Sequence, residues 1–271
     1  MKLTNKFNLP ETFVNVIRRP QYTRGDAQIS VTELLSPTQL VQLRAKHGDS
    51  LESDVSEMIW SLFGTAVHNI LEHGKGDNHI VEERLHTELN DWKISGAIDL
   101  QEVEEDGIIV SDYKVTGVWS VMAEKEEWVS QLNMYAWLVE RCKGVPVKKI
   151  QIVAIVRDWQ AREVDRKEGY PPSPVVVLDI DLWPFERREQ YIKDRLDHHN
   201  EGFFAAGTGT EYPECTPAEM WEKKTVYAIK KKGAARAKNL YGDKEEAYGL
   251  LEELGDAFEV EVREGERTRC E

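Results

Sequence analysis

Long apolar runs, cysteine and net positive charge are all scarce in this sequence of 271 residues. No stretch reaches the roughly 18 apolar residues that a membrane-spanning helix needs, which excludes a membrane-embedded protein. The first residues lack the apolar core of a signal peptide, so the sequence predicts a protein that stays in the cytoplasm. The three cysteines, Cys142, Cys215 and Cys270, give no even disulfide framework and fit a reducing compartment.

The formal net charge of −14 argues mildly against nucleic acid as a partner. Nucleic-acid binding follows local patches, however, and one basic run without a single acid extends over residues 223–238. It contains Lys223, Lys224, Lys230, Lys231, Lys232, Arg236 and Lys238. Two interpretations stay open, a solvated helix face or a track for the backbone of a polyanion.

The order of predicted elements indicates an α/β fold with a mixed central sheet flanked by helices. Strands are predicted over 79–89, 92–103, 108–115, 149–156 and 175–182, and helices over 55–73, 124–141 and 184–199. Residues 1–200 are expected to form one domain with a helical lead-in. A mostly helical extension over 201–271 is expected to pack on the same domain.

The helix predicted over 55–73 has Asp54 as its N-cap and carries His68 beside an apolar stripe. Gly64 lies inside this helix, where it costs about 1 kcal/mol relative to alanine. Such a glycine predicts the close approach of another backbone.

A β-hairpin is predicted around residues 92–115. Asp106-Gly107, between the two strands, is the strongest short signal for a tight hairpin turn. A two-residue turn at this point would place Asp99 opposite Lys114, with Asp112 two residues before that lysine. Opposed residues share a face at about 5 Å between Cβ atoms, so the three side chains are expected to converge. The other face reads as core, with Ile98, Leu100, Tyr113 and Val115.

Two carboxylates beside a lysine suit metal-assisted hydrolysis of a phosphodiester. That reaction needs an activated water, neutralisation of developing negative charge and help for the departing oxygen, and Mg²⁺ or Mn²⁺ can supply all three. Asp99 and Asp112 are the predicted carboxylate ligands, and His68 would complete the site. Lys114 would orient or deprotonate the water, or stabilise the transition state.

Each of these residues has a more ordinary interpretation when it is taken alone. A single helical histidine is more often a packed core residue, and an Asp-x-Lys on a strand is more often an exposed ion pair. Gln131 and Tyr135 share a helix face and could be an ordinary helix edge. Their joint occurrence, in this order and on these elements, favours a nuclease.

The combination resembles the PD-(D/E)XK nuclease superfamily, and within it the RecB-like exonuclease branch, which includes phage-encoded and CRISPR-associated nucleases. The resemblance covers about residues 30–200, and its one departure is Asp112 where many relatives have glutamate. It is carried by Gly64-x-x-x-His68, Gly96-x-x-Asp99, Asp112-Tyr113-Lys114 and Gln131-x-x-x-Tyr135. It implies a restriction-endonuclease-like core in the cytoplasm of a bacterium or of a phage-infected host.

The same resemblance implies roles for individual residues. The ligands of Mg²⁺ or Mn²⁺ would be His68, Asp99, Asp112 and the backbone carbonyl of Tyr113. Lys114 would be catalytic together with the two aspartates, and Gln131 and Tyr135 would position the DNA strand or the lysine. Either Glu82 or Glu83 from the preceding strand is also expected to face the site.

Many RecB-like nucleases hold an iron–sulfur cluster with four cysteines, one upstream and three near the C-terminus. Here only Cys215 and Cys270 lie in the C-terminal part. Two thiolates cannot hold a cubane cluster, so no cluster is expected.

The leading functional hypothesis is a Mg²⁺- or Mn²⁺-dependent deoxyribonuclease, an exonuclease acting in DNA replication, recombination or repair. Its partner would be single- or double-stranded DNA, with Lys230, Lys231 and Lys232 contacting the backbone. The alternatives are a catalytically inert DNA-binding or recombination accessory protein and a small-molecule phosphoesterase.

Overall fold

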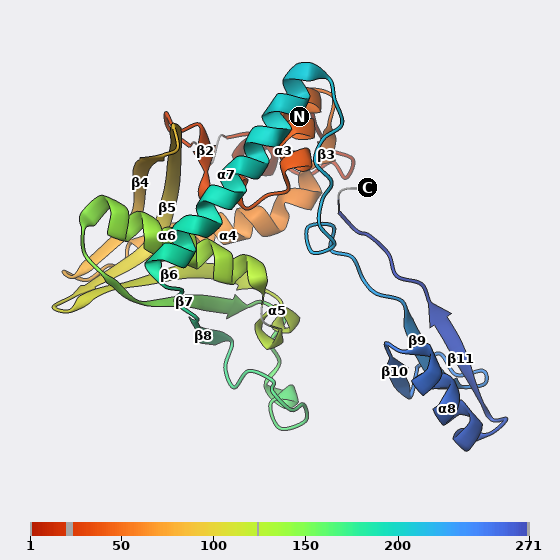
Figure 1. The fold of residues 1–271 in the computed structure, drawn as a ribbon. Coiled ribbons are helices and arrows are strands. Elements are labelled where there is room, and N and C mark those ends of the chain that lie inside the picture. Colours follow the sequence, from red (N-terminus) through yellow and green to blue (C-terminus); the bar gives the residue numbers. More distant parts are fainter. Residues whose placement is uncertain (1, 20–23, 124, 270–271) are drawn as a thin grey trace.

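The computed structural model describes residues 2–19, 24–123 and 125–269, and it confirms the predicted fold class. A central mixed sheet is flanked by helices, and Figure 1 shows a smaller unit near the C-terminus that stands apart from this main body. The sheet has the order β2-β5-β6-β7-β8, and β4 pairs with β5 as well. Its strands are β2 (Ile29–Ser30), β4 (His79–Leu89), β5 (Trp92–Glu104), β6 (Gly107–Thr116), β7 (Val147–Val156) and β8 (Val175–Ile180).

The hairpin of β5 and β6 forms as predicted, but its register differs. Glu104 pairs with Gly107 and Val103 with Ile108, so the turn consists of Glu105 and Asp106. Gly107 has a φ of 150° and sits against the Pro146 carbonyl, where a Cβ atom would come within 2.7 Å. The glycine therefore begins the strand instead of ending the turn. A two-residue shift keeps every side chain on its predicted face, because side chains alternate with a period of two.

Strand β5 changes partner along its length. Its residues from Leu100 to Glu104 pair with β6, whereas Ile94 and Ser95 pair with β2 in parallel. The strands β5 and β6 therefore separate beyond Leu100, and we call the opening between them the fork. Asp99 lies at the fork, next to Leu100, whose pairing with Ser111 is the last of the ladder.

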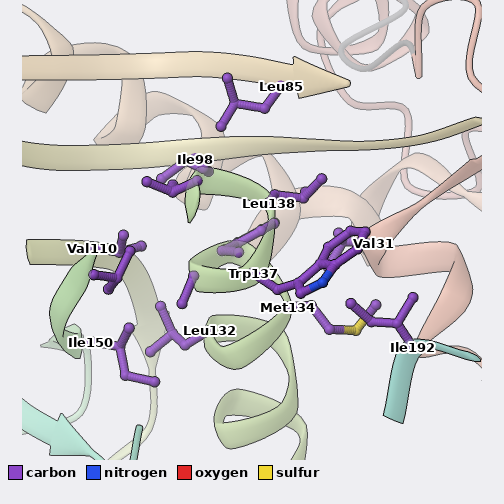
Figure 2. Close-up of a cluster of buried hydrophobic side chains, with 14 of the residues drawn as sticks. Val31, Leu85, Ile98, Val110, Leu132, Met134, Trp137, Leu138, Ile150 and Ile192 are labelled. Carbon is purple, nitrogen blue, oxygen red and sulfur yellow. The ribbon is translucent and has the colours of Figure 1, made fainter. Parts of the chain in front are cut away.

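One face of the sheet is covered by α6 (Glu126–Lys143), which α7 (Phe185–Thr208) covers in turn. In Figure 2, Trp137 and Leu138 of α6 lie among side chains from the strands, such as Ile98, and from α7, such as Ile192. The burial of these side chains is essentially complete. Truncation of a residue such as Leu132 to alanine is expected to cost about 2–5 kcal/mol of stability. This core fixes the sheet on which the fork opens.

The helix that carries His68 begins after a short 3₁₀ turn. Asp54 accepts a hydrogen bond from the Ser56 amide and forms a capping box with Glu57, so the predicted N-cap is confirmed. The turn η1 (Val55–Met58) leads into α4 (Ile59–Glu72), which contacts β6. No described residue of α4 is fully buried, which is unusual for so apolar a helix.

The other elements of the main body are short. Before α4 they are β1 (Lys2–Thr4), α1 (Glu11–Arg18), α2 (Val31–Leu34), α3 (Thr38–His47) and β3 (Glu52–Asp54). After β6 come α5 (Val118–Met122) and the 3₁₀ turn η2 (Ala161–Glu163). Within the described part of the chain, no helix combines the length and apolarity that crossing a bilayer requires.

The prediction of a mostly helical C-terminal extension is wrong. Beyond α7 the structure has β9 (Val226–Lys231), β10 (Asn239–Tyr241), α8 (Lys244–Leu254) and β11 (Phe258–Arg263). The three strands form an antiparallel sheet with β9 in the middle. The sequence Phe258-Glu-Val-Glu-Val-Arg explains the difference. Its apolar and charged residues alternate with a period of two, as in a half-buried strand. We call residues 226–263 the C-terminal unit; the expected division into domains stays a prediction.

Candidate metal centre

Two aspartates meet at the fork between β5 and β6. Asp112 is 2% exposed and Asp99 is 8% exposed. Continued by one residue, the register of the hairpin puts Asp99 opposite Asp112 instead of opposite Lys114. The Tyr113 amide donates a hydrogen bond to Asp99 Oδ2 at 2.8 Å, which holds this carboxylate between the separating strands.

Burial raises the pKa of Asp99, and the negative charge of Asp112 raises it further. His68, the Tyr113 amide and Lys114 act in the opposite direction and do not outweigh these two causes. The fork therefore concentrates more negative charge than the protein's own cations balance, and an additional cation would relieve it.

His68 reaches the fork from α4. Its Nε2 lies 3.0 Å from the Tyr113 carbonyl oxygen, and its Nδ1 lies 3.6 Å from Asp99 Oδ1. The Tyr113 ring meets the imidazole edge-on at 6.0 Å between centroids. The hydrogen bond to Glu82 and the charge of Asp99 raise the pKa of His68, although burial opposes this shift.

The structure distinguishes between the two acids of β4. Glu82 Oε1 lies 3.5 Å from His68 Nδ1, so Glu82 faces the fork. Glu83 instead pairs with Lys143 at 2.5 Å and accepts a hydrogen bond from Gln101 at 2.7 Å. Glu82 has a φ of 49°, a conformation that L-residues adopt rarely, yet the register of β4 on β5 is the same on both sides of it, with Val81 opposite Leu100 and Glu83 opposite Ile98. Continued through Glu82, this register places it level with Asp99, a pairing between strands that the sequence of β4 alone does not contain.

Lys114, together with Gln131 and Tyr135 of α6, surrounds Asp112 on its remaining sides. Lys114 Nζ lies 2.6 Å from Asp112 Oδ2, and Gln131 Nε2 donates to Asp112 Oδ1 at 3.3 Å. The same Gln131 amide donates to the Tyr135 hydroxyl at 3.0 Å. Gln131 and Tyr135 are thus part of one hydrogen-bonded chain that ends on the carboxylate of Asp112.

Gly96, three residues before Asp99, has a packing role. A Cβ atom at Gly96 would come 2.7 Å from Leu138 Cδ1 and 3.0 Å from the Tyr135 ring. Only glycine lets α6 approach β5 this closely, and this approach places Gln131 and Tyr135 above the fork.

For Gly64, the predicted close approach of another backbone is wrong. Among the described residues, nothing lies within 4 Å of a Cβ atom built there, apart from the helix itself and its chain neighbours. Gly64 precedes His68 by one turn on the same side of α4, so the space beside the histidine stays open.

The donor set fits a hard divalent cation. One ligand atom each from His68, Glu82 and Asp99 lie within 4.8 Å of one another. Octahedral Mg²⁺ with ligands at about 2.0–2.1 Å puts adjacent ligand atoms about 2.9–3.0 Å apart, and His68 Nδ1 lies slightly farther than this from Glu82 Oε1, at 3.5 Å, and from Asp99 Oδ1, at 3.6 Å. Carboxylate and carbonyl oxygens with one imidazole also match the preferences of Mn²⁺.

Asp112 is not part of this close group of three. Its carboxylate is engaged by Lys114 and Gln131, so its predicted role as a direct ligand stays a prediction. The structure nevertheless brings the predicted site residues of the main body to a single place, the fork. They are His68, Asp99, Asp112, Tyr113, Lys114, Gln131 and Tyr135.

The predicted DNA-contacting lysines lie elsewhere, on the C-terminal unit (Figure 1). Lys230 pairs with Glu261 at 2.5 Å and with Glu259 at 3.6 Å, while Lys231 and Lys232 are exposed. The basic run is not a helix face. It forms β9, a turn with Gly233 at a φ of 82°, and the approach to β10.

The cysteines of the C-terminal part lie outside the fork. Cys215 is buried and its Sγ donates to Gln39 Oε1 at 3.4 Å. Cys270 lies outside the described residues. The expectation that the chain binds no iron–sulfur cluster stays a prediction.

Comparison with known proteins gives only distant structural likenesses. No family model matches the sequence, and no curated protein matches it. The crystal structure of SSO0001 is similar with a TM-score of 0.47 at 16% identity, over 69% of this chain and 82% of that chain. A candidate exonuclease from Eubacterium rectale gives a TM-score of 0.31 at 12% identity, over 66% of this chain and 65% of that chain. Likeness at this level carries no argument about function, which must come from the fork itself.

Proposed function

We propose that this protein is a Mg²⁺- or Mn²⁺-dependent deoxyribonuclease of the PD-(D/E)XK type, an exonuclease similar to the RecB-like branch. The observation that carries the proposal is the meeting of His68, Glu82 and Asp99 within 4.8 Å, beside an Asp112–Lys114 pair. Two buried aspartates, a more exposed glutamate, one lysine and one imidazole in so small a volume match the needs of phosphodiester hydrolysis. A purely structural ion-pair network does not require this excess of negative charge.

His68, Glu82, Asp99 and the Tyr113 carbonyl would hold the cation. When it is bound, the cation supplies the positive charge that activates a water molecule and neutralises the scissile phosphate. Asp99 is held in place by the Tyr113 amide, and His68 by the same residue's carbonyl. The backbone of Tyr113 thus fixes the geometry of two ligands at once.

Lys114 is the proposed catalytic cation of the protein itself. Its ammonium lies 2.6 Å from Asp112 and can donate to an attacking water or to a phosphate oxygen. Gln131 limits the rotation of Asp112 through its hydrogen bond, so that this carboxylate keeps the lysine directed to the fork. Tyr135 in turn fixes the Gln131 amide.

The test is a cleavage assay on end-labelled and circular DNA, single-stranded and duplex, with Mg²⁺, with Mn²⁺ and with EDTA. The proposal predicts metal-dependent loss of linear DNA from an end and no loss of covalently closed circles. Cleavage that is undiminished in excess EDTA would rule out the mechanism. Cleavage of circles would make the enzyme an endonuclease. DNA binding without cleavage in any metal would favour the accessory-protein alternative.

The assay includes Lys143→Ala as a matched control for Lys114→Ala. Both lysines pair with a carboxylate, at 2.5 Å for Lys143 and 2.6 Å for Lys114, and their side chains are similarly buried. Lys143 pairs with Glu83, which does not face the fork. Activity is expected to survive in the control variant.

A further inference from the structure

An exposed tryptophan and an arginine are stacked on each other at one end of the central sheet. Trp60, near the start of α4, is 54% exposed. The guanidinium carbon of Arg157 lies 4.2 Å from the centroid of its ring. Within the described part of the chain, no carboxylate lies within ion-pair distance of Arg157, so its charge is available to a ligand.

The pair lies next to the proposed metal centre. Arg157 directly follows β7, and its amide donates a hydrogen bond at 2.9 Å to the carbonyl of Thr116, two residues beyond Lys114. On α4, Trp60 precedes His68 by about 12 Å along the helix axis. Because His68 contacts Tyr113 and Trp60 contacts Arg157, α4 follows β6 from the fork to the end of that strand.

A second tryptophan is exposed at the same end of the sheet. Trp119 lies three residues beyond Thr116, in α5, and is 70% exposed. The Val118 amide donates to Asp158 Oδ1 at 2.7 Å, which ties the start of α5 to the residue after Arg157. The fold therefore keeps this large apolar ring in water, and it does so one residue beyond the point at which α5 is tied to Asp158.

Other tryptophan–arginine pairs of the molecule differ in burial or position. Trp183, which faces Arg187 at 4.2 Å, is only 9% exposed and offers no surface to a ligand. Trp221 faces Arg269 at 4.8 Å and is 52% exposed, but it lies in the segment that leads to the C-terminal unit. Of these three tryptophan–arginine pairs among the described residues, the pair of Trp60 and Arg157 is the one that combines an exposed ring with a place on the helix that carries His68.

We propose that Trp60, Arg157 and Trp119 form a stacking site for the bases of a single-stranded segment of the substrate. This inference rests on the proposed function and adds a substrate form to it. Exposed aromatic rings and arginine planes bind unpaired bases without regard to sequence, because every base has a π face. The distance of about 12 Å from His68 corresponds to about three to four stacked nucleotides at 3.4 Å each.

Charge favours nucleic acid over a protein partner at this surface. The chain carries a net charge of −14, so a polyanion needs a local cation near the site that is to cut it. Arg157 supplies one, and its guanidinium can contact a phosphate while Trp60 holds a base. The C-terminal end of β6 lies two residues beyond Lys114, so a DNA single strand bound here would pass into the fork.

The experiment measures the affinity of the full chain for a fluorescently labelled oligothymidylate and for a blunt duplex, by anisotropy in EDTA so that nothing is cut. The variants are Trp60→Ala, Trp60→Phe and Trp119→Ala, and Trp221→Ala is the matched control with a similar exposed tryptophan–arginine pair. Loss of one stacked base is expected to weaken single-strand binding about fivefold or more for Trp60→Ala and for Trp119→Ala. Trp60→Phe is expected to restore most of the affinity, and Trp221→Ala and all duplex affinities are expected to change less than twofold.

Wild-type affinity for the single strand in both alanine variants would overturn the inference, and so would an equal loss in Trp221→Ala. If Trp60→Ala unfolds, Trp60→Leu takes its place, since leucine fills space without a stacking face. A wild-type chain that cuts DNA while all variants bind it equally would refute only the stacking site. A wild-type chain that neither cuts nor binds DNA would refute the proposed function as well.

Discussion

The fork and the C-terminal unit both place lysines beside carboxylates on neighbouring strand positions, yet the two regions differ in charge balance. At the fork, Lys114 pairs with Asp112, whose side chain is 3% exposed, and further acids crowd the same place. In the C-terminal unit, Lys230 lies between Glu259 and Glu261, whose side chains are 42% and 36% exposed. Residue types are thus the same in both regions, and burial separates them.

The difference teaches what marks a functional site in this molecule. Exposed ion pairs are screened by water and salt and contribute little to stability or chemistry. Burial, and then the negative charge of Asp112, raise the pKa of Asp99, and a bound cation would favour its charged form. The comparison therefore supports the proposal that chemistry takes place at the fork, and it leaves to the C-terminal unit, at most, the binding of a polyanion.

The largest expected effect is on Lys114. Lys114→Ala is expected to lower kcat for DNA cleavage by about 10²–10⁴-fold, because the proposed role lies in the transition state. DNA affinity and melting temperature are expected to stay close to wild type. The measurement is single-turnover cleavage with saturating Mn²⁺, and Lys230→Ala beside it is expected to keep a normal rate. If Lys114→Ala cuts as fast as Lys230→Ala, the two regions do not differ as the comparison requires.

The next effect concerns two adjacent glutamates. Glu82→Gln is expected to weaken Mn²⁺ affinity about tenfold, because it removes a charge from the metal centre. Glu83→Gln is expected to leave Mn²⁺ affinity unchanged and to affect only stability, since Glu83 pairs with Lys143. Calorimetric titration with Mn²⁺ separates the two. Equal losses in both variants would mean that the orientation of Glu82 toward His68 has no functional meaning.

A smaller effect is expected in the C-terminal unit. Replacing the exposed Lys231 and Lys232 with alanine is expected to weaken DNA binding a few-fold and to flatten its salt dependence. Each lost phosphate contact lowers the slope of log K against log salt by roughly 0.7–0.9. Lys230→Ala is expected to have less effect, because this lysine already has two carboxylate partners. Superimposable curves of DNA affinity against salt for wild type and the double variant would mean that these two lysines of the C-terminal unit do not contact DNA.

Much of the main body could be predicted because its signals are local. The strand predicted over 79–89 agrees with β4, and the Asp54 cap and the helix before His68 also follow from short sequence patterns. The two-residue spacing of Asp112 and Lys114 fixes their shared face whatever the register of the hairpin. For this reason the error of two residues in the register left the predicted cluster intact.

The remaining features depend on contacts that no short pattern contains. The turn lies one residue earlier than predicted because Gly107 packs against the carbonyl of Pro146, a residue distant in sequence. Glu82 lies level with Asp99 in the register of β4 on β5, and this register depends on the pairing of two strands. In the C-terminal unit, the alternation of residues 258–263 is the signal for a strand, whereas the charge of the basic run indicates neither helix nor strand.

The most direct test of the central claim is a calorimetric titration of the apoprotein with Mn²⁺, in wild type, Asp99→Asn and His68→Ala. The control is Asp179→Asn, since Asp179 is exposed and pairs with Lys149 on the surface. If the fork is a metal centre, wild type and Asp179→Asn bind Mn²⁺ equally, and each fork variant binds it at least about tenfold more weakly without a comparable loss of stability. Equal binding by all four proteins, or a His68→Ala variant that loses stability while it keeps its Mn²⁺ affinity, would contradict the account.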